Sequence, residues 1–163
     1  MNRGKMLHLD SFEKCVIIIA LCLFIITRFV GPAYVSGPSM EPTYKDGSFV
    51  IMTRYRSGQA IDRGSIVVAR EPDRGFLLIK RVVAVPGDRI YAENKQLYVN
   101  GSPEEGGFPL FEDPGILSLP LILGEDEYFL MGDNRSHSTD SRIFGPVSAD
   151  DVVGVVFTGW REN

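Results

Sequence analysis

One uncharged apolar run near the N-terminus limits what this chain can fold into. Residues 15–27 read CVIIIALCLFIIT and contain no charged side chain. If residues 16–35 form one helix, it is about 30 Å long, which matches the hydrocarbon core of a bilayer. A helix without a polar face is rare in a soluble core. The sequence therefore predicts a transmembrane anchor over residues 15–35.

The flanks of this run favour an anchor that is retained. Arg28 lies toward the far end, where a long side chain can reach the lipid headgroups, and Pro32 is expected to end the helix. A cleaved signal peptide is the alternative, but Pro32 would fall at the cleavage site. Three basic residues precede the run, so we expect residues 1–14 in the cytoplasm and residues 36–163 outside the cell membrane.

Composition excludes several function classes for residues 36–163. This part holds 13 basic and 19 acidic residues, a net charge of −6, which argues against binding to nucleic acid. Both cysteines, Cys15 and Cys22, lie in the apolar run, and the chain has only two histidines. We therefore expect no disulfide framework and no metal site.

The part after the anchor consists of short runs rich in β-branched and aromatic residues, separated by Gly, Pro, Asn or Asp. This pattern predicts a mostly β domain, built as a barrel or as packed sheets. Residues 102–126 contain four prolines and are expected to form an irregular excursion, in which the apolar piece 117–123 fills the core or touches lipid. The expected strands are 49–55, 65–70, 76–85, 89–93, 96–99, 128–131 and 152–160.

Ser39 is a candidate nucleophile because of its setting. Gly37, Pro38 and Pro42 surround it and predict a rigid, non-helical loop. A lone serine of this kind is usually only a turn residue. A nucleophilic role requires a base within reach.

Two side chains could be that base. His137 is the only histidine after the anchor, and Asp133 or Asp140 could orient it in a triad. Lys80 lies in an apolar strand, where burial would lower its pKa and free the amine to accept a proton. By strand alternation Lys80 and Arg81 point to opposite faces, and both could simply extend to solvent at a strand edge. The residues alone leave these alternatives open.

Three blocks of sequence resemble bacterial type I signal peptidases. They read SGPSMEPT at 36–43, KRVVAVPGD at 80–88 and GDNRSHSTDSRIFGPV at 132–147. They occur in the order of that family, after an N-terminal anchor, and the last block is long and specific. The resemblance implies a mostly β catalytic domain that uses a Ser/Lys mechanism without a cofactor.

The same resemblance assigns catalytic roles. Ser39 matches the nucleophile of the family and Lys80 its general base. Ser138 matches the serine that hydrogen-bonds the lysine amine and orients it. His137 falls at a variable position of the last block, which disfavours a triad.

The resemblance also assigns supporting roles. Asp140 and Arg142 match a structural pair that supports the last block, and Met40 lines the substrate side. Gly37 stands where some members of the family carry a hydroxyl residue of the oxyanion hole. We therefore expect the hole to use the N–H of Ser39 and another main-chain donor near Gly37.

The implied function is removal of signal peptides from exported preproteins by a membrane-bound serine endopeptidase. Its expected partners are preprotein signal peptides, with small side chains at the first and third positions before the cut, and the lipid bilayer. The alternatives are a specialised relative that matures a conjugation pilin or works at the mitochondrial inner membrane, and an inactive relative that only binds peptides. The short excursion at 102–126 indicates a minimal form of the family.

Overall fold

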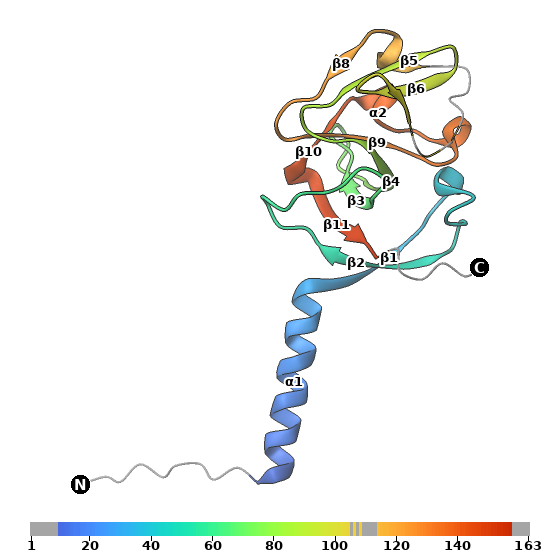
Figure 1. Ribbon diagram of the computed structural model, residues 1–163. Coiled ribbons are helices and arrows are strands. Elements are labelled where there is room, and N and C mark those ends of the chain that lie inside the picture. The colour runs from blue at the N-terminus through green and yellow to red at the C-terminus, as the bar shows by residue number, and fades with distance from the viewer. Residues whose placement is uncertain (1–9, 105, 107, 109–113, 158–163) are drawn as a thin grey trace.

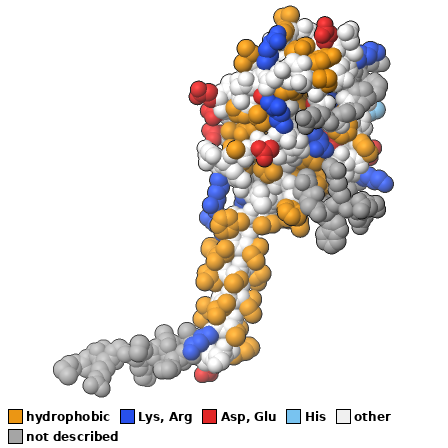
Figure 2. Space-filling model, viewed as in Figure 1, with side chains coloured by type: hydrophobic (Ala, Val, Ile, Leu, Met, Phe, Trp, Pro, Cys, Tyr) orange, Lys and Arg blue, Asp and Glu red, His pale blue; other side chains and the backbone are white. Residues whose placement is uncertain are grey.

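The apolar run forms most of helix α1 (Ser11–Phe29), which projects from a β-rich domain (Figure 1). The computed structural model describes residues 10–104, 106, 108 and 114–157. Asp10 caps α1, and its backbone N–H donates to the Glu13 carboxylate at 3.0 Å. No residue of α1 is buried, and the helix forms a nearly continuous hydrophobic column below the domain (Figure 2). Among the described residues, no helix combines the length and apolar character that a membrane crossing requires.

The expected helix over residues 16–35 is too long. It ends at Phe29, and the next residues form strand β1 (Val30–Tyr34). Pro32 cannot continue a helix because it has no N–H. Instead β1 pairs antiparallel with β2 (Phe49–Arg54), with Val30 opposite Thr53. The sheet of the domain therefore begins directly after α1, without a linker.

Two antiparallel sheets make up the domain, so the mostly β prediction is confirmed. The first has the order β1-β2-β11-β3-β4-β9-β10 and the second the order β7-β6-β5-β8. The first sheet adds β3 (Ile66–Arg70), β4 (Leu77–Ala84), β9 (Glu127–Met131), β10 (Val147–Ser148) and β11 (Val152–Val156) to the β1–β2 pair. The second contains β5 (Arg89–Glu93), β6 (Gln96–Val99), β7 (Ser102–Pro103) and β8 (Leu121–Ile122), and a short helix, α2 (Ser141–Phe144), follows β9.

Each strand expected from the sequence is present, with small shifts of its ends. The expected strand 152–160 runs over Val152–Val156, and residues 158–160 lie outside the described residues, as do residues 1–9 of the expected cytoplasmic segment. The excursion at 102–126 is more regular than expected, because it supplies β7, β8 and a 3-10 helix at Gly115–Ser118.

The apolar piece 117–123 contributes to the core through its first and last residues, Leu117 and Leu123. Leu117 and Leu123 are buried against Ile90, Leu97 and Phe129, where the second sheet packs on the first. Leu119 and Ile122 are exposed. The prediction that this piece fills the core is therefore correct for Leu117 and Leu123. Their burial attaches residues 102–126 to the rest of the domain.

Two leucines of this piece give a matched test of its role. Leu117 is fully buried and Leu119 is 74% exposed. Leu117→Ala should lower the free energy of unfolding by about 2–5 kcal/mol, because it leaves a cavity. Leu119→Ala should change it by no more than about 0.5 kcal/mol. Chemical unfolding of the purified variants measures both, and equal effects would show that the piece does not pack as described.

Candidate active site

Ser39 lies in the connection between β1 and β2, in a 3-10 helix at Pro38–Met40. Gly37 precedes this helix with a φ of 88°, a conformation that only glycine adopts readily. The Met40 side chain is fully buried in a cluster with Val35 and Val50. The glycine and the buried methionine together fix the direction in which Ser39 points.

Lys80 meets Ser39 from the centre of the first sheet. It lies on β4, opposite Val67 of β3, and is 4% exposed. Its Nζ lies 2.7 Å from the Ser39 Oγ, at hydrogen-bond distance. When the amine is neutral this hydrogen bond can reverse, so that the serine hydroxyl donates to Nζ. This is the geometry that a general base needs.

Burial also gives Lys80 the electrostatics of a base. Loss of hydration lowers the pKa of Lys80 below its ordinary value, although the negative charges of Asp140 and Asp133 partly oppose this effect. Both carboxylates are themselves paired with arginines, Arg142 and Arg81. The lysine thus lies near two carboxylates without forming an ion pair with either.

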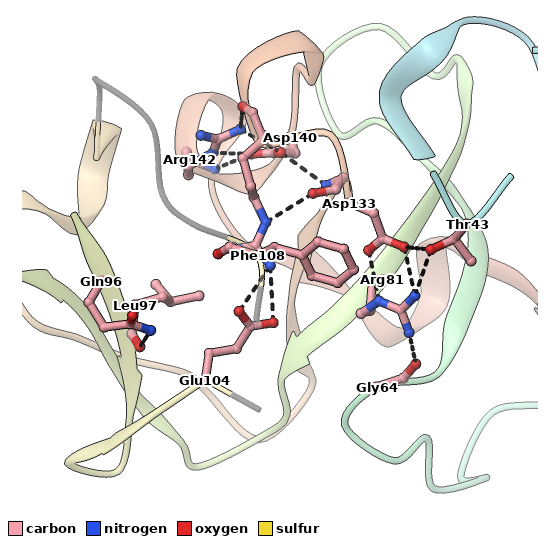
Figure 3. A network of polar contacts seen from close by, with 12 residues as sticks. Thr43, Gly64, Arg81, Gln96, Leu97, Glu104, Phe108, Asp133, Asp140 and Arg142 are labelled. Carbon is pink, nitrogen blue, oxygen red and sulfur yellow. Dashed lines mark hydrogen bonds and ion pairs between the residues drawn. The ribbon is translucent and has the colours of Figure 1, made fainter. Parts of the chain in front are cut away.

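Arg81, the neighbour of Lys80, points to the other side of the strand and binds Asp133 (Figure 3). Its Nε and Nη2 donate to the two carboxylate oxygens at 2.7 and 2.6 Å, and its Nη1 donates to the carbonyl of Gly64. The Thr43 hydroxyl donates to the same carboxylate. The alternative in which Arg81 simply extends to solvent is therefore wrong, because a buried carboxylate requires a partner.

This network was not predicted from the sequence. The sequence suggests Asp133 only as a partner for His137, and its ion pair with Arg81 spans 52 residues. One feature of the sequence indicates such a network. Lys80 and Arg81 are adjacent basic residues in an apolar strand, so each needs a polar partner on the face to which it points. The network links the strand that carries Lys80 to the loop that carries Ser39, through Thr43, and to the loop after β9, through Asp133.

The loop after β9 is tied directly to the Ser39 backbone. The Asn134 N–H donates to the Ser39 carbonyl at 3.0 Å, and the Asn134 Nδ2 donates to the Pro38 carbonyl at 3.2 Å. A Cβ on Gly132 would lie 2.5 Å from the Ser39 carbonyl oxygen and 2.3 Å from the Ser138 Oγ. Only glycine allows the two loops to approach this closely.

Ser138 lies beside the site, but it does not make the contact that the resemblance implies. Its Oγ is buried and has no hydrogen-bond partner among the described residues. The expected hydrogen bond to the Lys80 amine is therefore absent. The Lys80 Nζ instead forms a hydrogen bond with the Ser39 Oγ. The supporting role of Ser138 remains a prediction.

Asp140 and Arg142 form a buried ion pair at the base of the same loop (Figure 3). The Arg142 Nε and Nη2 donate to the two Asp140 oxygens at 2.8 and 2.9 Å. Asp140 also accepts from the Gly132 N–H at 3.1 Å, and Arg142 donates to the Arg135 carbonyl at 2.6 Å. The pair thus joins both ends of the loop, and its supporting role for catalysis remains a prediction.

A second buried ion pair connects this loop to the second sheet. The Arg135 Nη2 lies 3.0 Å from the Glu104 carboxylate, which follows β7, and both side chains are almost fully buried. The Arg135 Nε donates to the Gly132 carbonyl. The excursion at 102–126 therefore supports the site through Glu104, a contact that the sequence did not suggest.

The backbone around Ser39 offers one candidate oxyanion donor. The Gly37 N–H donates to the Asp46 carboxylate at 2.8 Å, so it is already engaged. The Ser39 N–H lies in the first turn of the 3-10 helix at Pro38–Met40, where a backbone N–H has no partner within the helix. The role of the Ser39 N–H as a donor in the oxyanion hole remains a prediction. The Gly37 N–H is not the second donor of the hole, because it is bound to Asp46.

Among the described residues, His137 forms no hydrogen bond with Ser39. It is exposed, and its Nδ1 lies 3.0 Å from the Ser136 hydroxyl and 3.2 Å from the Asn134 side-chain oxygen. Asp133 and Asp140, its two candidate orienters, are each paired with an arginine. The histidine triad is therefore not assembled.

Comparisons with known proteins agree with the three sequence blocks. A family model described as signal peptidase, peptidase S26, matches residues 9–160. Signal peptidase IB of Staphylococcus aureus is 33% identical over 159 residues, which cover 85% of this chain and 82% of the relative. Signal peptidase I V of Bacillus subtilis (strain 168) is 35% identical over 140 residues, covering 75% of this chain and 80% of that protein.

A crystal structure of a signal peptidase I from Enterococcus faecalis V583 is 26% identical, with a TM-score of 0.49, and the match covers 61% of this chain and 98% of that one. The identification does not depend on it. The family match spans nearly the whole chain, and the curated relatives are similar over most of their own length. The chain belongs to the signal peptidase family, peptidase S26.

Proposed function

We propose that this protein is a membrane-bound serine endopeptidase that removes N-terminal signal peptides from exported preproteins, with Ser39 as nucleophile and Lys80 as general base. One observation carries the assignment of the dyad: the Lys80 Nζ is buried and lies 2.7 Å from the Ser39 Oγ. The substrate class follows from membership of the signal peptidase family. The same contact disfavours an inactive peptide-binding relative, because it positions a base on a nucleophile.

The proposed reaction uses Lys80 twice. The neutral amine takes the proton of the Ser39 hydroxyl while Oγ attacks the scissile carbonyl carbon, and the resulting oxyanion is stabilised by the Ser39 N–H. The Lys80 ammonium then gives its proton to the leaving amine, which leaves an acyl ester on Ser39. Water hydrolyses this ester with Lys80 again as base, and the free serine is restored.

The same proposal places α1 as the anchor in the cell membrane. Support comes from the uncharged run at 15–27 and from the exposure of every residue of α1. The Arg28 side chain, in the last turn, is long enough to extend to the headgroups. Residues 36–163 then form the extracytoplasmic catalytic domain, with residues 1–14 in the cytoplasm.

Replacing the nucleophile should abolish cleavage. Ser39→Ala removes the attacking oxygen, so kcat should fall by roughly 10⁴-fold or more. Ser36 lies three residues earlier in the same loop and is exposed, so Ser36→Ala serves as the control and should retain most activity. Cleavage of a model preprotein by the purified variants measures both, and a comparable loss in both would move the assignment away from Ser39.

The pH profile tests Lys80. A general base must be neutral, so activity should rise with pH through the pKa of Lys80, and burial places this pKa below that of a free lysine. Lys80→Arg should be inactive at every pH, because a guanidinium does not release its proton. The measurement is the rate of peptide cleavage against pH.

His137→Ala is the control for this profile. Because His137 is exposed and contacts Ser136 and Asn134, its loss should leave the profile unchanged. If the Lys80→Arg variant is active, or if His137→Ala abolishes the pH dependence, the general base is His137 and not Lys80.

The substrate should carry small side chains at the first and third positions before the cut. A peptide that lies along a sheet edge presents alternate side chains to the enzyme, so two pockets two residues apart are expected. Replacing the alanine before the cut by a bulky residue should reduce kcat/KM by at least about 100-fold. Peptides that differ only at this position measure the ratio, and indifference to the change would contradict the expectation.

A further inference from the structure

The short segment that fixes the Ser39 backbone is flanked by two arginine contacts. Asn134, whose N–H donates to the Ser39 carbonyl at 3.0 Å, lies between Asp133 and Arg135 in the chain. The Asp133 carboxylate accepts from the Arg81 Nη2 at 2.6 Å. The Arg135 side chain is almost fully buried. The place of Asn134, and with it that of the Ser39 backbone, therefore depends on two guanidinium groups.

One aromatic ring contacts both of these guanidinium groups. The centre of the Phe108 ring lies 5.6 Å from the Arg81 Cζ (Figure 3). It lies 5.4 Å from the Arg135 Cζ. Both distances are in the range of a cation–π interaction, which is stronger where water is excluded. The Phe108 carbonyl also accepts from the Arg135 Nη1 at 3.3 Å, so this residue contacts Arg135 twice.

Glu104 connects the same arginine to the second sheet. Its backbone N–H donates at 2.9 Å to the carbonyl of Leu97, a fully buried residue of β6. Its two carboxylate oxygens accept from the Arg135 Nη2 at 3.0 and 3.1 Å. A buried guanidinium requires a compensating charge and hydrogen bonds. Glu104 therefore determines where the Arg135 side chain can lie.

We propose that Phe108 and Glu104 are positioning residues for Ser39. Both lie in the excursion at 102–126, outside the three sequence blocks that identify the family. They act through Arg81 and Arg135, which hold the loop after β9 against the Ser39 backbone. This role rests on the proposed function of Ser39 as nucleophile.

The role predicts that kcat and KM respond differently when these contacts are lost. Ser39 and Lys80 remain present in such variants, but the loop that fixes the Ser39 backbone gains freedom. A displacement of about 1 Å at a reacting group can lower a rate by roughly 100-fold. Neither Phe108 nor Glu104 is proposed to contact the substrate, so KM should stay within about threefold of the native value.

Phe108→Leu tests the ring, because it keeps an apolar side chain and removes the aromatic face. In the full chain in detergent micelles, kcat for a peptide that contains a signal peptide cleavage site should fall about tenfold. Phe108→Tyr keeps the ring and should stay within about twofold of the native kcat. Tyr91→Leu is the matched control, because Arg89 lies 5.2 Å from the centre of the Tyr91 ring in the second sheet. It should also keep kcat within about twofold.

Glu104→Gln tests the charge, because the side chain keeps nearly the same shape. In the same assay kcat should fall about 30-fold. Asp88→Asn is the matched control: Asp88 is buried, and its carboxylate is bound by Arg63, Val85 and Asn100, none of which belongs to the loop after β9. Chemical unfolding should show that both variants lose stability, whereas only Glu104→Gln loses kcat.

The double variant tests whether the two residues act through one loop. Phe108→Leu and Glu104→Gln both act on Arg135, so their combined loss of kcat should be smaller than the product of the single losses. A full product would mean that they act independently and would contradict the shared route. An equal loss of kcat in Asp88→Asn would reduce the effect to general stability and would also contradict the proposal.

Ser39→Ala, measured alongside, separates the remaining failures. If it is inactive while Phe108→Leu and Glu104→Gln cleave like their controls, the positioning role is wrong and the nucleophile stands. A rise in KM at unchanged kcat would mean that the two residues act on substrate binding, which also overturns the positioning role. If Ser39→Ala cleaves normally, the proposed nucleophile is wrong, and the positioning role is wrong with it.

Discussion

The contact between the Lys80 amine and the Ser39 hydroxyl constrains the rest of this structure. An amine at 4% exposure loses most of its hydration, which disfavours the charged form, yet Asp133 and Asp140 lie close enough to favour it. Their ion pairs with Arg81 and Arg142 compensate the two negative charges. Without these arginines, either carboxylate would stabilise the ammonium and remove the base. In the proposed mechanism, Arg81 and Arg142 are thus needed because a lysine that acts as a base must be neutral.

The arrangement of strands explains why these groups meet. Lys80 and Arg81 are adjacent on β4 and point to opposite faces, so one strand serves both the dyad and the Asp133 network. Arg81 lies opposite Met131, the last residue of β9, and the loop that contains Asp133 begins directly after it. A shift of this pairing by one residue would exchange the faces of Lys80 and Arg81. The buried ion pair with Asp133 opposes such a shift, because it would leave the carboxylate without a partner.

The sequence predicted that Ser39 and Lys80 belong to one site, but it did not predict the ion pairs around them. Strand alternation is local, so the opposite faces of Lys80 and Arg81 could be read from the sequence, and the three blocks identified Ser39. The ion pairs of Arg81 and Arg135 connect residues that are 52 and 31 positions from their partners, and no local pattern predicts which carboxylate each arginine meets. The predicted end of α1 is wrong because the local sequence is ambiguous there. The apolar character of residues 30–35 suits both a membrane helix and a strand, and pairing with β2 decides between them.

The length of the connection between β1 and β2 would ordinarily make it a poor support for the proposed nucleophile, Ser39. Residues 35–48 form no tight hairpin, and a mobile serine would lose the positioning on which catalysis depends. Several contacts remove that freedom. The Val35 N–H donates to the Ser48 carbonyl and closes the loop at its base, while Met40 is buried in the core. Asn134 then fixes the backbone of Ser39 from the opposite side. The loop reaches the lysine on β4, which is three positions from β2 and four from β1 in the sheet order, and it is held at both its base and its tip.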